Sequence, residues 1–201
     1  MANANRPSGL SPVMPSMGVN YNGGGRVYCI PETDDTNAYA IGDPVASAGS
    51  SDSNGIPTVT LATAGSGNAI RGVVMSAGGL VNGAFLADPT NLNTIVIPAT
   101  KTKNYYVLVI DDPMVIFEAQ EEATGTAFTA AEVGLNANLV AGTNNGYLSG
   151  WQIDRTSPGT GATLQVKLLQ LAPRPGNAFG DYAKWWVLIN NHELKAGVAG
   201  V

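Results

Sequence analysis

Charge is the property that this sequence has least of. Only 12% of its 201 residues are Asp, Glu, Lys or Arg, whereas roughly 25% is usual in soluble domains. Because the centres of protein interfaces are depleted in charged side chains, this composition favours a component of an assembly. A neutral β domain rich in Thr and Asn, with ordinary solvent exposure, is the alternative that composition leaves open.

Paired cysteines, a signal peptide and long apolar runs are missing as well. The one cysteine, Cys29, excludes an intrachain disulfide, and a chain without disulfides is typical of a reducing compartment. Its apolar, strand-like neighbours predict a buried and unreactive thiol. Residues 1–7 lack the basic-then-apolar pattern of a signal peptide. Because no apolar run reaches the length of a membrane span, we expect no membrane partner.

The few charges are also not clustered. The formal net charge is −5, and the basic residues are scattered, with Lys101 and Lys103 as the nearest approach to a cluster. Proteins that bind nucleic acids through phosphate groups gather Lys and Arg on one surface. We therefore expect no nucleic-acid partner.

Residues suited to catalysis or metal binding are sparse. The only histidine, His192, has no nucleophile motif or further zinc ligands in the sequence and is expected to be a hydrogen-bonded residue at a strand end. A hydrolase built on Glu118 and a distant Asp is a weak hypothesis, because adjacent acids such as 111–112 do not face each other across a cleft. Oxygen ligands at 33–36 and 52–55 lack the spacing of an EF-hand loop. We predict no enzyme, no catalytic residue, no metal site and no cofactor.

What the chain does contain is a series of short β patterns separated by turn residues. These patterns cover residues 58–62, 71–75, 93–97, 105–110, 115–119, 147–153, 163–171 and 185–189. Four Asn-Gly pairs, at 22–23, 54–55, 82–83 and 145–146, add hairpin signals. Many short strands with almost no helix predict an all-β fold, namely a jelly-roll-like sandwich or barrel.

Three local patterns predict details of that fold. Residues 105–110 are apolar on both faces, which indicates a central strand or one beneath an interface. Within 163–171 the alternation slips by one residue, which predicts a β-bulge near Leu168 and Leu169. Residues 129–132 match a capping box and predict about one helical turn.

The N-terminal segment differs in composition from the rest. Residues 1–25 are rich in proline and glycine and too thinly apolar to bury themselves, so we expect an extended arm that orders on a neighbouring subunit, with a disordered tail as the alternative. Residues 26–192 then form one β-rich domain, and 193–201 form a C-terminal tail. The candidate anchors of the arm are Leu10, Val13, Met14 and Met17.

Three tryptophans supply the remaining candidates for binding. Trp185 and Trp186 are adjacent, so they point to opposite faces of a strand. One is expected in the core and the other at a protein interface, where aromatic anchors are common. A carbohydrate-binding β module that stacks sugars on Trp151 or on this pair is the alternative function.

Several segments together resemble a known family. In order along the chain they are residues 38–45 (AYAIGDPV), 54–59 (NGIPTV), 71–74 (RGVV), 106–120 (YVLVIDDPMVIFEAQ), 134–138 (GLNAN) and 186–192 (WVLINNH). Each motif alone is weakly specific, whereas their order is more so. Together they are similar to the head decoration, or cement, proteins of short-tailed bacteriophages.

This resemblance implies a specific set of expectations. The chain would be a non-enzymatic, homo-oligomeric virion protein that folds in the host cytoplasm and sits on the outer capsid surface. Its partner would be the major capsid protein, whose neighbouring subunits it would clamp so that the head is stabilised. The partner-binding residues would be the arm anchors named above and whichever of Trp185 and Trp186 faces outward.

Overall fold

The computed structural model describes residues 3–16, 24–77, 79–81, 84–86, 95–197 and 199–200. Nearly all of the regular structure is β, which confirms the predicted all-β class. The elements are β1 (Ser11–Pro15), β2 (Arg26–Ile30), β3 (Pro44–Ser51), β4 (Pro57–Leu61), β5 (Gly72–Ala77), β6 (Gly79–Val81), β7 (Ala84–Leu86), β8 (Tyr105–Ile110), β9 (Val115–Gln120), the 3-10 turn η1 (Ala130–Glu132), β10 (Asn136–Ala137), β11 (Leu139–Val140), β12 (Gln152–Ile153), β13 (Val166–Leu171) and β14 (Lys184–Ile189). No helix in the described part of the chain is long and apolar enough to cross a membrane.

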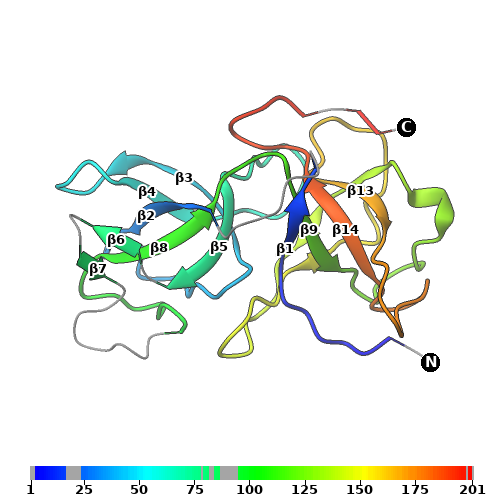
Figure 1. The fold of residues 1–201 in the computed structure, drawn as a ribbon, viewed down its shortest axis with the longest axis horizontal. Coiled ribbons are helices and arrows are strands. Elements are labelled where there is room, and N and C mark those ends of the chain that lie inside the picture. The colour runs from blue at the N-terminus through cyan, green and yellow to red at the C-terminus, as the bar shows by residue number, and fades with distance from the viewer. Residues whose placement is uncertain are drawn as a thin grey trace.

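One half of the molecule, the barrel lobe, is a closed barrel with the strand order β2-β4-β3-β5-β8 (Figure 1). Strand β8 pairs with both β2 and β5, which confirms that residues 105–110 form a central strand. The hairpin between β3 and β4 turns at Asn54–Gly55, where the φ of Gly55 is 78°. This confirms the hairpin signal at that Asn-Gly pair.

The other half, the sheet lobe, is a five-stranded sheet in the order β1-β9-β14-β13-β10, with the ribbon β11-β12 beside it. Its core contains large aromatic side chains, among them Phe117, Phe128, Trp151 and Trp185. The pairing of β13 with β14 shifts register between Leu168 and Gln170, which confirms the predicted bulge. The Thr129–Glu132 capping box is present as well.

The barrel lobe is inserted in sequence between two paired strands of the sheet lobe. Pro15 of β1 lies opposite Val115 of β9, and the backbone N–H of Ser16 donates to the carbonyl of Met114 at 2.7 Å. The chain therefore begins and ends in the sheet lobe (Figure 1). Insertions are tolerated where the two chain ends lie close together, as they do here. The cores of the two lobes meet at Leu61, which packs against both.

This topology corrects the expectation of an extended N-terminal arm. Residues 11–15 are the edge strand β1 of the chain's own sheet, and Leu10 is fully buried in the core of the sheet lobe. The few apolar residues of this segment are enough to hold it in the fold, because the backbone of β1 forms its hydrogen bonds with β9. Few of its side chains therefore have to be buried in the core. The prediction that Leu10 anchors a neighbouring subunit is wrong, and Met17 lies outside the described residues.

Two expected strands are also shorter than the sequence patterns indicate. Within 147–153 only Gln152–Ile153 is a strand. Tyr147 lies in a turn, in which the Asn145 side-chain oxygen accepts from the N–H groups of Tyr147 at 3.0 Å and Leu148 at 2.8 Å. Asn side chains compete in this way with strand pairing. In 93–97 the described residues contribute one bridge, from Ile97 to Tyr39.

Candidate functional site

No group of three or more His, Cys, Asp or Glu side chains in the described ranges is placed to hold a metal ion. His192 is 2% exposed, its Nδ1 accepts from the Leu194 N–H at 3.0 Å, and burial lowers its pKa to about 4. It is thus a neutral, buried imidazole just beyond β14.

The carboxylates considered in the sequence are engaged in structural contacts. Glu118 forms ion pairs with Arg174 and Lys184. Asp111 accepts from the Tyr28 hydroxyl at 2.7 Å. Asp52 accepts from the N–H groups of Asn54 and Ile56, both at 2.8 Å, so that its oxygens organise the β3–β4 turn. Carboxylates already occupied by donors on their own loop are poorly suited to bind a cation.

Cys29 is expected to resist thiol reagents while the protein is folded. Its side chain is fully buried in β2, and burial, followed by the nearby charge of Asp52, raises the pKa of the thiol to about 11. Because the thiolate is the nucleophile, the native protein should react with a maleimide far more slowly than the urea-unfolded protein. Equal labelling rates in the two states, followed by mass spectrometry, would contradict this expectation.

The tryptophans divide between core and surface as strand alternation requires. Trp185 is fully buried, packs edge-on against Phe128 at 5.7 Å between ring centroids, and donates from Nε1 to Glu121 at 3.0 Å. Trp151 is 2% exposed. Neither ring can meet a partner or a sugar, which corrects their assignment as candidates. Trp186 is half-buried on the opposite side of β14, and it remains a candidate for contact with a partner.

Trp186 belongs to the outer face of the five-stranded sheet, the side turned away from the core. Directly opposite pairs share a face, so the strand register places side chains in rows across it. One row is Ser11, Glu118, Trp186 and Gln170, and the next is Met14, Ile116, Leu188 and Lys167. Met14, Trp186 and Leu188 are half-buried and Ile116 is 9% exposed. We call these four residues the apolar strip.

The strip brings together two of the predicted partner-binding residues from opposite ends of the chain. Met14 comes from β1 and Trp186 from β14, with β9 between the two strands. Val13 is half-buried at the register shift in β1. Sequence reasoning missed Ile116 and Leu188, although the apolar residues Trp186 and Leu188 on the second face of β14 repeat the signal that identified residues 105–110.

Comparison with protein-family models, curated proteins and solved structures finds no match to this chain. Its function is therefore argued from the surface itself. A sheet face with an apolar strip between charged side chains has the composition of a protein contact.

Proposed function

We propose that this chain is a structural protein of a phage head, without enzymatic activity, which binds the outer capsid surface and clamps neighbouring subunits of the major capsid protein. The observation that carries the proposal is the apolar strip on the outer face. Four apolar side chains from three strands lie in register on a sheet face that the chain leaves partly open. The low charge of the whole sequence, 12%, supports the same conclusion.

The mechanism of stabilisation is linkage. A protein that binds only the assembled lattice shifts the equilibrium toward the lattice, and each copy needs to bury on the order of 1,600 Å² for a stable contact. Trp186 is the expected centre of that contact, because a large aromatic at the middle of an interface often dominates its binding energy. Self-association into an oligomer would multiply the contacts made by each particle.

The edge of the sheet favours docking through the face over docking by strand addition. Edge strand β1 carries Pro12 and Pro15 and a register shift between Pro12 and Met14. Proline has no N–H to donate, and irregular edges discourage the pairing of a further strand. A partner therefore meets side chains of the outer face more readily than the backbone of β1.

Trp186→Ala is expected to weaken attachment to heads that lack this protein by about thirtyfold, the size of an interfacial hot spot. The measurement is co-sedimentation of purified protein with such heads over a concentration series. Because the contact is apolar, the loss should be similar at low and at high salt.

Ile95→Ala is the control, since Ile95 is an exposed apolar residue (44%) near the bridge between Ile97 and Tyr39, away from the outer face. It should bind as the unchanged protein does. If the unchanged protein does not bind heads, the proposal fails. A glycan array that gives hits abolished by Trp186→Ala would then establish the carbohydrate-binding alternative.

A further inference from the structure

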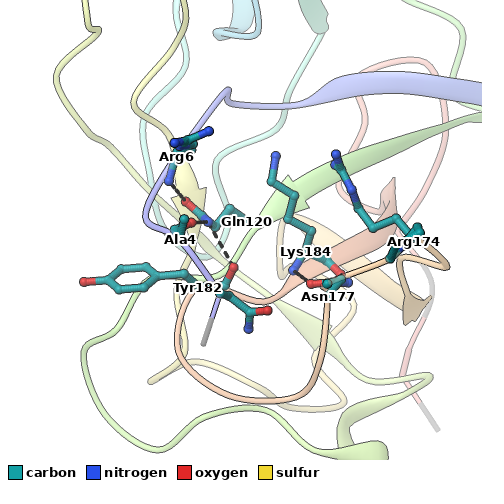
Figure 2. A pocket seen from close by; sticks show the side chains of 10 residues that line it. Ala4, Arg6, Gln120, Arg174, Asn177, Tyr182 and Lys184 are labelled. Carbon is teal, nitrogen blue, oxygen red and sulfur yellow. Dashed lines mark hydrogen bonds between the residues drawn. The ribbon is translucent and has the colours of Figure 1, made fainter. Parts of the chain in front are cut away.

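The N-terminal residues 3–8, which we call the strap, cross the end of the outer face above Gln120. The Gln120 side chain donates to the carbonyls of Ala4 at 2.8 Å and Tyr182 at 2.9 Å, and accepts from the Arg6 N–H at 3.1 Å (Figure 2). Asn3 donates to the carbonyl of Ala178 at 2.8 Å. These hydrogen bonds hold the strap against the loop that precedes β14.

The strap is also fixed at its other end, next to Leu10. Gly9 has a φ of 62°, and a Cβ there would lie 2.2 Å from the carbonyl oxygen of Gly42. Only glycine fits such a close approach with a positive φ. The Leu10 N–H then donates to the Gly42 carbonyl at 3.0 Å. A segment held at both ends presents its side chains in a defined place, without an ordering cost on binding.

Two cavities adjoin the strap and share the residues Arg6 and Lys184. One has a volume of about 330 Å³ and is also lined by Arg174, Asn177 and Tyr182. The other, of about 510 Å³, is also lined by Ser8, Thr143, Asn145 and Ser149. We call the two together the strap cleft. Its lining residues include no Asp or Glu.

The strap cleft is positively charged in a chain whose net charge is −5. In Figure 2 the charged ends of Arg6, Lys184 and Arg174 extend toward the same side of the pocket. Among the ion pairs of the described residues, the carboxylate that contacts cations of the cleft is Glu118, which lies 2.5 Å from Arg174 and 3.4 Å from Lys184. Arg6 is exposed and makes no ion pair with another described residue. Three cations against one anion leave an excess of positive charge.

We propose that the strap cleft binds an acidic segment of the coat protein, with carboxylate side chains on Arg6, Lys184 and Arg174. This inference rests on the proposed function. Arginine presents a planar fork of donors that matches a carboxylate. Lys184 lies on the same face of β14 as Trp186, two residues away, so acidic residues in the cleft would place adjoining apolar residues on the apolar strip.

The test on isolated protein uses a six-residue glutamate peptide with blocked ends, followed by fluorescence anisotropy at about 20 mM salt, where screening is weak. We expect saturable binding that falls at least about fivefold in Arg6→Gln/Lys184→Gln and is lost near 0.5 M salt. The control is Arg26→Gln/Lys103→Gln, which removes the same charge from the barrel lobe and should bind as the unchanged protein does. Absence of binding, or equal losses in both double variants, would overturn the proposal.

Two further experiments, a competition assay and a head-binding assay, separate this inference from its alternatives. If inorganic phosphate or a thymidine decanucleotide competes better than the glutamate peptide, the cleft binds phosphate and the assignment to carboxylates is wrong. If heads bind Arg6→Gln/Lys184→Gln as well as the unchanged protein but lose Trp186→Ala, the cleft proposal fails while the proposed function stands. If heads do not bind even the unchanged protein, although the peptide binds it, the proposed function fails and the coat protein is excluded as the source of the acidic segment.

Discussion

Replacing Arg155 by methionine is expected to lower the free energy of unfolding by about 3 kcal/mol, the cost of breaking a buried, hydrogen-bonded charge network. The guanidinium is almost fully buried and spans one loop. It donates to the carbonyls of Glu122 at 2.9 Å, Gly125 at 2.6 Å and Thr126 at 3.1 Å, and to the Asp181 carboxylate at 2.8 Å. Urea unfolding of the variant and the unchanged protein measures the difference.

The Arg155→Met substitution should also weaken the attachment of the strap. Asp181, which Arg155 holds through its carboxylate, gives its backbone carbonyl to the Asn3 side chain at 3.0 Å. The loop held by Arg155 also carries Phe128, which packs on Trp185 beneath the outer face. Arg155 therefore fixes both the strap and the support of the apolar strip.

Arg155→Lys separates charge from geometry. Lysine keeps the positive charge but has no planar fork, so it cannot reach three carbonyls and a carboxylate together. We expect Arg155→Lys to lower the free energy of unfolding by less than Arg155→Met does. If Arg155→Met unfolds within about 0.5 kcal/mol of the unchanged protein, the range of ordinary surface substitutions, the loop does not depend on this side chain.

The features that the sequence predicted correctly depend on near neighbours. Alternation along β14 separates Trp185 from Trp186, and a one-residue slip marks the bulge after Leu168. The capping box at Thr129 needs only Glu132 three residues later. Such patterns are set by the repeat of the backbone, so no knowledge of distant contacts is needed.

The features that were missed depend on contacts between distant segments. Strand β1 exists because Pro15 and Val115 come together across the whole inserted barrel lobe. No pattern within residues 1–25 contains that information, and so the sequence alone predicts an extended arm that orders on a neighbouring subunit. Part of the candidate site could be predicted, because Trp186 follows from alternation. The strap cleft could not, because Arg6, Arg174 and Lys184 are brought together only by the contacts of Asn3 and Gln120 with the loop before β14.

Stability is expected to change little between pH 4.5 and 6.5, because two buried groups titrate with opposite effects. Burial raises the pKa of Glu121 from 4.5 to about 7, so the folded state holds this proton more tightly than the unfolded state. The stability from neutral Glu121 is present in full below pH 4.5 and is lost as the pH rises through 7. A shift of this size corresponds to about 3 kcal/mol.

His192 acts in the opposite direction. Burial, together with the charges of Lys195 and Arg71, lowers its pKa from 6.5 to about 4, whereas the negative charges of Asp111 and Glu193 oppose the shift. The folded state therefore disfavours the charged imidazole. The stability from neutral His192 is present in full above pH 6.5 and is lost as the pH falls through 4, again by about 3 kcal/mol.

The geometry of Glu121 explains why its charge is costly. Its carboxyl is fully buried, and one oxygen accepts from the Trp185 indole, while the other has no hydrogen-bond partner among the described residues. The attraction of Arg155 lowers the pKa only in part, and Asp181 opposes it. A buried carboxylate with one unpaired oxygen is favoured in its neutral form.

Single variants should separate the two groups. In Glu121→Gln the free energy of unfolding should rise by about 3 kcal/mol from pH 4 to pH 6.5, because only the His192 effect remains. In His192→Gln it should fall by a similar amount from pH 4.5 to pH 7. Urea unfolding at half-unit intervals of pH measures all three profiles. Glu122→Gln, at a half-buried neighbour that contacts Arg155 only through its backbone carbonyl, should keep the profile of the unchanged protein. If Glu121→Gln and Glu122→Gln give parallel profiles, the carboxyl of Glu121 does not titrate between the folded and unfolded states in this range, and its burial in the sheet lobe is incorrect.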